Sequence, residues 1–366
     1  MLWRIFSILM IVIATAGVIY LITRFHRFSL LQRLGEQHKF ISWLLATVPV
    51  AALACFYFIN VTTMAVVLLH VILFWLFCDF IAWIIGRACK KKLNRDWQGI
   101  AALLIVTVYL GIGWYLGHHV YQTNYALTTA KELGRESLRI VEIADSHLSI
   151  TLDGQDFARI VDQIQEAQPD LVVIVGDFVD DDTDREDMLE ACRALGALDT
   201  PLGVYFAFGN HDLGYFNYRN FTGQELRAAL TENGVTILED ESVLLNDQFY
   251  LISRRDRSMR GCLEASELTA QLDTSKYMIL LDHQPNDYAG ETAANVDLVL
   301  SGHTHGGHIF PAGYIGLAIG ANDNVYGLQR RENTDFIVTS GASGWAIPFK
   351  TGTISEFVVI DITQIS

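Results

Sequence analysis

The chain has 366 residues, of which 51% are hydrophobic and 18% are charged, a more apolar composition than that of an ordinary soluble protein. At about 150 residues per domain, this length predicts two domains. The net charge of −15 is unevenly divided: residues 1–120 hold 10 Lys and Arg against 3 Asp and Glu, a net of +7, and the remainder holds 16 against 38, a net of −22. So acidic a second half would repel phosphate backbones, which argues against nucleic acid as a standing partner.

The first half contains four long apolar stretches. A bilayer core needs about 20 apolar residues per helix, so we predict a four-helix transmembrane domain over residues 1–120. Ala14-Thr15-Ala16 resembles a signal-peptidase site, but the apolar stretch continues beyond it, and we expect this span to be retained. Asp79, in the third stretch, either forms a polar intramembrane site or faces another helix or the interface. The predicted spans are about 5–23, 40–60, 61–86 and 98–117.

Basic residues cluster in two of the connecting segments and predict the orientation. The turn between the second and third spans carries no charge. The positive-inside rule therefore places both basic segments in the cytoplasm and everything after Gly117 outside it. These basic residues are Arg24, Arg27, Arg33 and Lys39 in the first segment, and Arg87, Lys90, Lys91, Lys92 and Arg95 in the second.

A connector over 121–137 is expected next, partly helical from Thr128 to Arg135, and then a domain over 138–366. In that domain, five apolar strand-like runs each end in metal-capable residues. The runs are 138–143, 171–175, 204–208, 277–281 and 296–300, with helical spacing over 156–167 and from Met188 to Leu198. Sites in α/β sheets lie at the carboxyl ends of strands, so these side chains are expected to meet. They are Asp145, His147, Asp177, Asn210, His211, Asp212, His283, His303 and His305.

The stretch Ser301 to Gly307 is the densest of these clusters. In an extended turn, side chains at i and i+2 point the same way, so His303 and His305 can reach one site. The mixed oxygen and nitrogen donors suit Mn, Fe, Zn or similar ions, and the absence of thiolates argues against a closed structural zinc. Seven ligands are too many for one ion, which a carboxylate bridging two ions would resolve. Taken alone, Asp177 could cap a helix and His211 could be a surface histidine.

The ordered series of motifs resembles the calcineurin-like metallophosphoesterase superfamily. The motifs are Asp145-x-His147, Gly176-Asp177, Gly209-Asn210-His211-Asp212, His283 and Gly302-His303-x-His305, within residues 138–308. The tail, with Tyr326-Gly327-Leu328, Arg331, Ser340-Gly341 and Pro348, resembles the membrane-associated bacterial phosphodiesterase-like branch. The resemblance implies an α/β fold, a two-sheet metallophosphoesterase sandwich, here preceded by the four-helix transmembrane domain.

The resemblance also implies a role for each residue. Asp145, His147 and His305 would hold one divalent metal ion, Asn210, His283 and His303 a second, and Asp177 would bridge them. His211 would stabilise or protonate the leaving oxygen, and Asp212 would orient His211. Asp180 occupies the place of the metal-binding Tyr of purple acid phosphatases, so no Tyr–iron centre is expected, and Asp180 could support a ligand from behind.

These observations predict a membrane-anchored metallophosphoesterase that hydrolyses a phosphoester, most readily a phosphodiester. Its substrate could be lipid or envelope-derived. The alternatives are a pyrophosphatase or phosphomonoesterase acting on a lipid-linked or nucleotide-sugar substrate, and a membrane sensor or scaffold without turnover. The sequence leaves open whether Cys192 and Cys262 pair.

Overall fold

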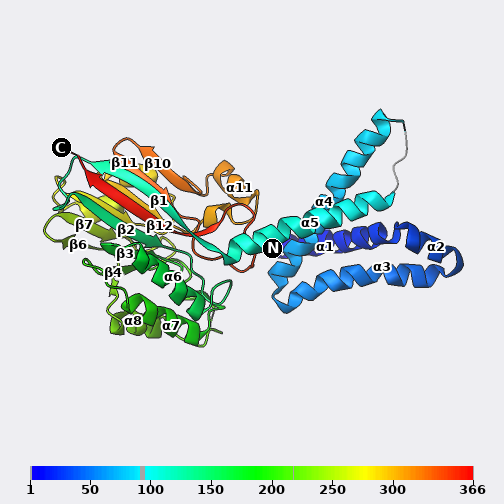
Figure 1. Cartoon of the computed structure of the whole chain (residues 1–366), viewed down its shortest axis with the longest axis horizontal. Coiled ribbons are helices and arrows are strands. Elements are labelled where there is room, and N and C mark those ends of the chain that lie inside the picture. Colours follow the sequence, from blue (N-terminus) through cyan, green and yellow to red (C-terminus); the bar gives the residue numbers. More distant parts are fainter. Residues whose placement is uncertain (1, 91–94, 217, 366) are drawn as a thin grey trace. The chain divides into compact units, whose positions relative to one another are not determined.

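The computed structural model describes residues 2–90, 95–216 and 218–365, with only the backbone described for 2–11, 13 and 95. The chain divides into two compact units, Met1–Ile112 and Gly113–Ser366. Figure 1 shows the first unit as helices and the second as strands and helices.

The first unit is helical because its sequence is apolar with few helix breakers. Among the described residues, three stretches are long and apolar enough to cross a membrane: Lys39–Phe58, Val61–Ala88 and Asp96–His118. The first predicted span falls on α1 (Leu2–His26), where the side chains of residues 2–11 and 13 are not described, so it stays a prediction. Lys91 and Lys92 of the second basic segment also lie outside the described residues. The helices are α1 (Leu2–His26), α2 (Ser29–Gln37), α3 (Lys39–Ala54), the 3-10 helix η1 (Cys55–Phe58), α4 (Val61–Ala88) and α5 (Arg95–His118).

Asp79, on α4, faces another helix. Its carboxylate lies 2.8 Å from the guanidinium of Arg24 at the end of α1. An ion pair of this kind is how charged side chains within apolar helices are usually accommodated. This contact agrees with the second of the two readings of Asp79.

The second unit contains two six-stranded sheets. Sheet A has the strand order β1-β12-β2-β3-β4-β5, and sheet B has the order β10-β11-β9-β8-β7-β6. Strands β2, β3 and β4 run parallel, as do β7, β8 and β9, so within each sheet the carboxyl ends of these three strands lie at one edge. The strands are β1 (Val120–Thr129), β2 (Ser137–Ile143), β3 (Leu171–Val175), β4 (Val204–Ala207), β5 (Thr236–Ile237), β6 (Glu241–Leu245), β7 (Phe249–Ser253), β8 (Tyr277–Leu281), β9 (Leu298–Ser301), β10 (Gly327–Arg331), β11 (Thr334–Val338) and β12 (Ser355–Gln364).

The two sheets pack face to face, with helices outside them. One apolar core, including Ile140, Val173 and Ile279, joins the facing sides of the sheets. A second, including Phe157 and Met188, joins sheet A to α6, α7 and α8, and a third joins sheet B to α9 and α10. Burial of both faces explains why β3 reads as the unbroken apolar run Leu171–Val175. The helices are α6 (Gly154–Glu166), α7 (Arg185–Gly196), α8 (Gly223–Glu232), α9 (Ala265–Thr269), α10 (Tyr288–Ala293) and α11 (Ala312–Ala318).

The predicted connector is not a linker. Residues 120–129 form β1, which pairs in parallel with β12 along its whole length, and residues 130–136 are not helical. The predicted helix from Thr128 to Arg135 is therefore wrong. Its physical reason is that β1 is an edge strand, whose half-exposed polar residues resemble a loop.

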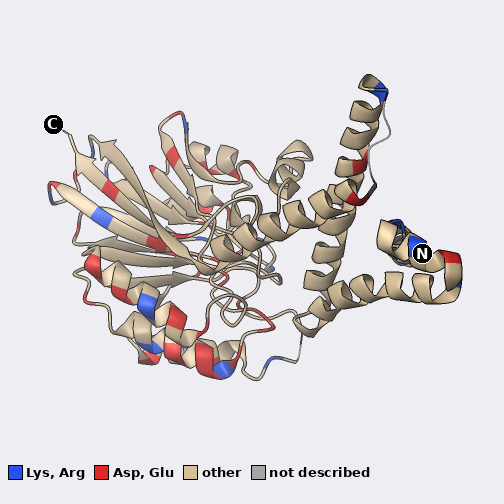
Figure 2. Ribbon diagram, turned by 45° about the vertical axis from the view of Figure 1, so that its right-hand side comes forward, with Lys and Arg blue, Asp and Glu red and all other residues tan. Residues whose placement is uncertain are grey.

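The second unit carries most of the acidic side chains of the chain. Figure 2 shows Asp and Glu spread over its helices and strand ends, whereas the helices of the first unit are almost free of them. Cys192 is buried and Cys262 half-buried, and both are free thiols rather than partners in a disulfide.

Candidate metal centre

The predicted ligands follow the ends of five strands from both sheets. Asp145 and His147 follow β2, Asp177 follows β3 and Asn210 follows β4, all in sheet A. In sheet B, His283 follows β8, and His303 and His305 follow β9. The structure brings these residues together into two neighbouring groups.

The first group is Asp145, His147 and His305. One possible ligand atom from each residue lies within 4.8 Å of those of the other two, and all three side chains are buried. The Nε2 atom of His305 is 3.8 Å from Oδ1 of Asp145. This is the set predicted for the first ion.

The second group is Asp177, His283 and His303, with the same 4.8 Å limit. Asn210 lies beside it, since its Oδ1 is 3.0 Å from Nδ1 of His303. The Oδ2 atom of Asp177 is 3.0 Å from Nε2 of His283 and 3.8 Å from Nε2 of His147. The Asp177 carboxylate thus lies between the two groups, where a bridging ligand would have to be.

Three of the imidazoles have one nitrogen anchored by the protein. The Nδ1 atoms of His283 and His305 lie 2.8 Å and 3.1 Å from the carbonyl oxygens of Val175 and Ser343. That of His147 lies 3.1 Å from Oδ2 of Asp180. A metal-binding histidine typically donates its other N–H in this way.

The other ring nitrogen of these histidines, Nε2, allows a test of whether metal ions would fit between the two groups. The Nε2 atom of His147 is fully buried and has no hydrogen-bond partner among the described residues. That of His283 is also buried, and it lies 3.0 Å from Oδ2 of Asp177 in a geometry that makes no hydrogen bond. Burying an unpaired polar atom costs about 1–3 kcal/mol, so such atoms call for an explanation. Both face Asp177, and a divalent ion at each group would give them a partner. The residues present therefore fit the metals that the donor set predicts.

The backbone around the groups is strained. Five of the seven predicted ligands are non-glycine residues with positive φ: Asp145, His147, Asp177, His303 and His305. Each such residue costs about 1–3 kcal/mol and tends to occur at functional sites. The neighbouring glycines permit close approach: a Cβ on Gly302 would lie 2.5 Å from the Asp145 carboxylate, and one on Gly176 would lie 2.5 Å from the ring of His283.

Burial and charge set the protonation of the groups. Burial lowers the pKa of His303 to about 4 and holds that of His305 well below its ordinary value. Burial alone would raise the pKa of Asp177, but the charge of His283, whose Nε2 lies 3.0 Å from Oδ2 of Asp177, lowers it below its ordinary value. For His303, His305 and Asp177 these shifts favour the neutral imidazole and the ionised carboxylate, which are the forms that bind metal ions. Burial alone would lower the pKa of His283, but the charge of Asp177 outweighs burial and raises this pKa well above its ordinary value, so a metal ion bound there would displace a proton.

His211 lies at the rim of this site. Its backbone N–H donates to Oδ1 of Asp177 over 2.8 Å, and its ring centre is 5.2 Å from that of His147. The ring borders a cavity of about 520 Å³, which three acidic side chains and four aromatic ones line. These are Asp180, Asp181, Asp182, Tyr215, Phe216, Tyr218 and Trp345.

Asp212 has a different set of contacts from the one predicted for it. Its two carboxylate oxygens accept hydrogen bonds from the backbone N–H groups of Asp177, Phe178, Val179 and Gly209, at 2.7–3.1 Å. Asp212 therefore fixes the two loops that carry Asp177 and Asn210. Any orienting effect on His211 would act through these loops rather than through contact with the ring.

Apart from Asp180, the sequence did not predict the groups that hydrogen-bond to the far side of the proposed ligands. The hydroxyl of Tyr215 accepts a 2.9 Å hydrogen bond from Nδ2 of Asn210, which leaves the amide oxygen facing His303. The Val175 and Ser343 carbonyls act similarly on histidines. Backbone carbonyls have no sequence signature, and Tyr215 had only its closeness to Asn210 to mark it.

The fold and the site together define a class, α/β proteins of two mixed sheets with a candidate metal centre at the strand ends. Residues 138–307 match the family model described as calcineurin-like phosphoesterase. An uncharacterized metallophosphoesterase of Aquifex aeolicus is 33% identical over 219 residues, which cover 58% of this chain and 80% of that protein. The chain therefore belongs to the metallophosphoesterase family, a family of phosphoric ester hydrolases.

Two further relatives are longer than the matched part. An uncharacterized metallophosphoesterase of Campylobacter jejuni is 30% identical over 233 residues, covering 62% of this chain and 60% of that protein. A zebrafish (Danio rerio) protein named "Transmembrane protein with metallophosphoesterase domain" is 33% identical over 240 residues, covering 62% of this chain and 53% of its own length. The chain thus spans little more than half the length of these two relatives.

Proposed function

We propose that this chain hydrolyses phosphodiesters with the help of two divalent metal ions. The observation that carries the proposal is the position of the Asp177 carboxylate, 3.0 Å from His283 and 3.8 Å from His147, between two groups that could each hold an ion. The proposed ligands are Asp145, His147 and His305 for one ion and Asn210, His283 and His303 for the other, with Asp177 shared.

When bound, the two ions would neutralise charge on the phosphoryl group and lower the pKa of the attacking water. The chain supplies the rest of the chemistry. Asp177 fixes the backbone of His211, which places the imidazole where the cavity meets the ligand groups. As water oxygen bonds to phosphorus and the ester P–O bond breaks, His211 would donate its proton to the departing oxygen.

The cavity beside His211 supports a diester rather than a monoester. Its described lining residues include Asp180, Asp181 and Asp182 and no Lys or Arg. This acidic wall would oppose the doubly charged phosphate of a monoester more than the singly charged phosphate of a diester. The aromatic side chains Tyr215, Phe216 and Trp345 offer apolar surface to an organic leaving group.

A comparison of two chromogenic substrates tests this preference. Bis-nitrophenyl phosphate and nitrophenyl phosphate share a leaving group and differ in the charge on phosphorus. With Mn²⁺ and the full chain, we expect the larger kcat/KM for the diester. A larger value for the monoester would replace the proposal with the phosphomonoesterase alternative.

We further propose that the enzyme is anchored in a membrane by several spans, with the second unit outside the cytoplasm. Three described helices are long and apolar enough to span, and the zebrafish relative is named a transmembrane protein. The predicted side depends on the two basic segments. An enzyme so placed would have access to lipid or envelope-derived phosphoesters.

A further inference from the structure

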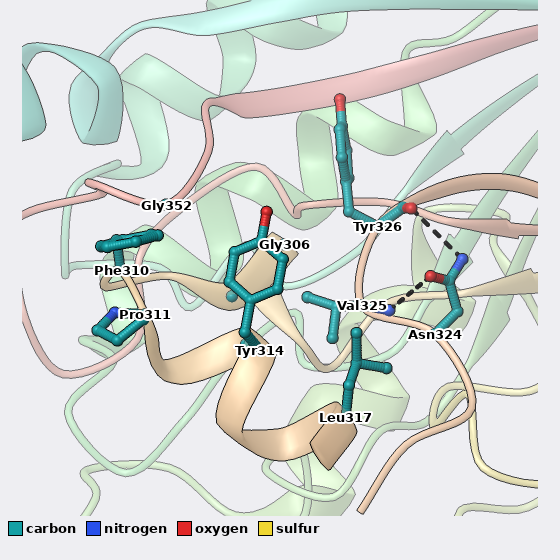
Figure 3. Close-up of a pocket in the computed structure, with 11 residues that line it drawn as sticks. Gly306, Phe310, Pro311, Tyr314, Leu317, Asn324, Val325, Tyr326 and Gly352 are labelled. Carbon is teal, nitrogen blue, oxygen red and sulfur yellow. Dashed lines mark hydrogen bonds between the residues drawn. The ribbon is translucent and has the colours of Figure 1, made fainter. Parts of the chain in front are cut away.

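A second pocket, of about 260 Å³, lies in the second unit and is lined mainly by apolar and aromatic side chains. Helix α11 contributes Tyr314 and Leu317 to one wall, and the opposite wall is made by Val325 and Tyr326. Figure 3 shows Tyr314 and Leu317 rising from the helix beside Val325, with Phe310 at the other end of the pocket. Nothing in the proposed metal chemistry uses this pocket.

The pocket adjoins the turn that carries two of the proposed metal ligands. Gly306 and Gly307 line it and directly follow His305. The hydroxyl of Thr304 donates a 2.6 Å hydrogen bond to the carbonyl of Val325, which ties the far wall to the same turn. Helix α11 packs on this turn so closely that a Cβ on Gly313 would lie 2.7 Å from Cα of Gly307. A molecule in the pocket would therefore lie next to the metal centre.

The apolar side chains around the pocket are unusually exposed. None of the seven residues of this fully described helix is buried, and Tyr314 and Ile315 are 69% and 57% exposed. Phe310 and Ile319, on either side of the helix, are 57% and 75% exposed. So many exposed apolar side chains on one short helix and its two flanks, in an otherwise acidic unit, indicate a surface that has a partner.

The end of α5 indicates which partner this is. Residues 113–118, the last turns of α5, belong to the second unit, and the carbonyl of Gly113 accepts a 2.8 Å hydrogen bond from the backbone N–H of Lys350. The next residue, Thr351, accepts from the N–H of Phe310 over 3.1 Å and donates its own N–H to the carbonyl of His308. The pocket wall is thus hydrogen-bonded through one short segment to the end of a helix that could cross a membrane.

The last turns of α5 have the side chains of a membrane interface. Trp114 and Tyr115 are each 51% exposed. Trp and Tyr are enriched where spanning helices leave the bilayer, because their rings are apolar and their edges polar. The exposed rings of Phe310 and Tyr314 contact each other at the pocket, and the hydrogen bonds of Lys350 and Thr351 connect this part of the pocket to the end of α5.

We propose that the pocket beside α11 binds a hydrocarbon chain of a membrane lipid whose phosphodiester group lies at the metal centre. The proposal rests on the proposed function and names its substrate class. In this proposal, the exposed face of α11 contacts the lipid surface, and the pocket holds one hydrocarbon chain of the substrate.

A series of nitrophenyl alkyl phosphodiesters with ethyl, butyl and hexyl groups tests the proposal. The leaving group is the same throughout, so only the alkyl chain changes. Each buried methylene contributes about 0.8 kcal/mol, which is a factor of about four in affinity. With the full chain in lipid nanodiscs, even partial burial of the added methylenes should raise kcat/KM by about tenfold or more from ethyl to hexyl.

Two variants and a matched control separate the pocket from simple partition into the lipid. Tyr314→Ser and Leu317→Ser remove pocket-lining side chains, whereas Ile315→Ser removes an equally apolar residue of the same helix that does not line the pocket. The esters partition equally into the nanodisc lipid in the samples of all three variants, so partition alone cannot change the ratio between variants. We expect the hexyl-to-ethyl ratio of kcat/KM to fall severalfold in the first two variants and to stay at the wild-type value in Ile315→Ser. Thermal unfolding confirms that each variant is folded, and either pocket variant suffices for the comparison.

Binding of ethyl and hexyl phosphonates to the same proteins, measured by calorimetry, needs no turnover. If binding depends on the length of the alkyl chain but no ester is hydrolysed, the proposed function is wrong and the pocket assignment is supported. Hydrolysis with the same hexyl-to-ethyl ratio in all variants, or an equal fall in Ile315→Ser, would overturn the pocket assignment alone. Absence of both hydrolysis and chain-length-dependent binding would overturn both.

Discussion

Three histidines of the candidate metal centre are oriented by contacts between Nδ1 and protein oxygen atoms, which do not depend on a bound ion. His147, His283 and His305 each have Nδ1 within hydrogen-bonding distance of an oxygen atom of the protein. This fixes the ring orientation and the tautomer, and it aims Nε2 at the place proposed for the metals. Each of these contacts makes the role of an individual residue testable.

The first prediction concerns the shared carboxylate. Asp177→Asn should remove nearly all hydrolysis and lower the metal content. The Asp177 carboxylate lies beside both ligand groups, and the amide of Asn has no negative charge and only one oxygen that can accept. His303→Ala should do the same for the second group alone. Elemental analysis of the purified proteins measures the metal content, and Asp199→Asn, an exposed change, is the control. Full metal occupancy in Asp177→Asn would count against a bridging role.

His211→Ala should keep both ions and lose most of the rate, by about 10²–10⁴-fold, the usual contribution of a general acid. A nitrophenyl ester, whose leaving group needs little protonation, should lose less than an alkyl ester. The measurement is kcat for the two esters beside the metal content. Equal losses on both esters would show that His211 does not protonate the leaving oxygen.

Asp180 is predicted to act on the metal through His147. Asp180→Asn weakens the 3.1 Å contact to Nδ1 of His147 and should lower metal affinity by about 10–100-fold with the fold intact. Metal titration of the apoprotein gives the affinity. Asp182→Asn, a neighbouring exposed carboxylate, is the control for this readout. Unchanged affinity in Asp180→Asn would remove Asp180 from the centre.

The sequence indicated which residues meet at the strand ends because each of them follows an apolar strand, and their roles as metal ligands stay predictions. It named all seven proposed ligands, and the structure gathers them. It could not predict that both Asp212 oxygens bind backbone N–H groups, since nothing local to Asp212 distinguishes a partner on a side chain from one on a neighbouring loop.

At the scale of elements, the segment between β11 and β12 holds the centre against the end of α5. The fully buried Lys350 donates hydrogen bonds to the carbonyls of Gly341 and Ile354 over 2.9 Å and 3.3 Å. Gly341 is itself packed against Asp145, where a Cβ would approach to 2.5 Å. One ammonium group therefore closes the loop behind a proposed ligand.

Lys350→Met should destabilise the protein by about 2–4 kcal/mol, because it keeps the volume and leaves buried carbonyls without a donor. For a unit of this size, that corresponds to a fall in Tm of roughly 4–15 °C. Thermal unfolding of the full chain measures it. A Tm equal to that of the wild type would show that the ammonium group does not stabilise this loop.

The elements themselves were predictable where both faces are buried. The predicted strands at 171–175 and 277–281 coincide with β3 and β8, because their residues are all apolar. Strand β1 was missed because its partner β12 lies more than 200 residues away and its own side chains alternate between exposed and half-buried. Helix α11 has no apolar periodicity, since none of its residues faces a core in this fully described segment.

At the scale of the whole molecule, charge asymmetry predicts the side of the membrane. Nine Lys and Arg lie in the two predicted cytoplasmic segments, against Arg4 on the other side. Each basic residue near an anionic leaflet is worth about 1 kcal/mol, so the bias amounts to several kcal/mol. The second unit should therefore lie outside the cytoplasm.

A cysteine introduced at the exposed residue Asp199 tests this orientation. On intact cells, an impermeant thiol reagent should label Asp199→Cys more than the wild type, which supplies the background from the native cysteines. A reporter active only outside the cytoplasm, fused after Ser366, should be active. Protection of the cysteine together with a silent reporter would place the unit in the cytoplasm.

The dependence of hydrolysis on metal content tests the account most directly. The full chain is stripped with a chelator and then titrated with Mn²⁺ or Zn²⁺, while bound metal and diester hydrolysis are measured on the same samples. The account predicts no activity without metal and full activity as occupancy approaches two ions per chain. Hydrolysis that survives complete removal of metal, or that reaches its maximum at one ion per chain, would contradict it.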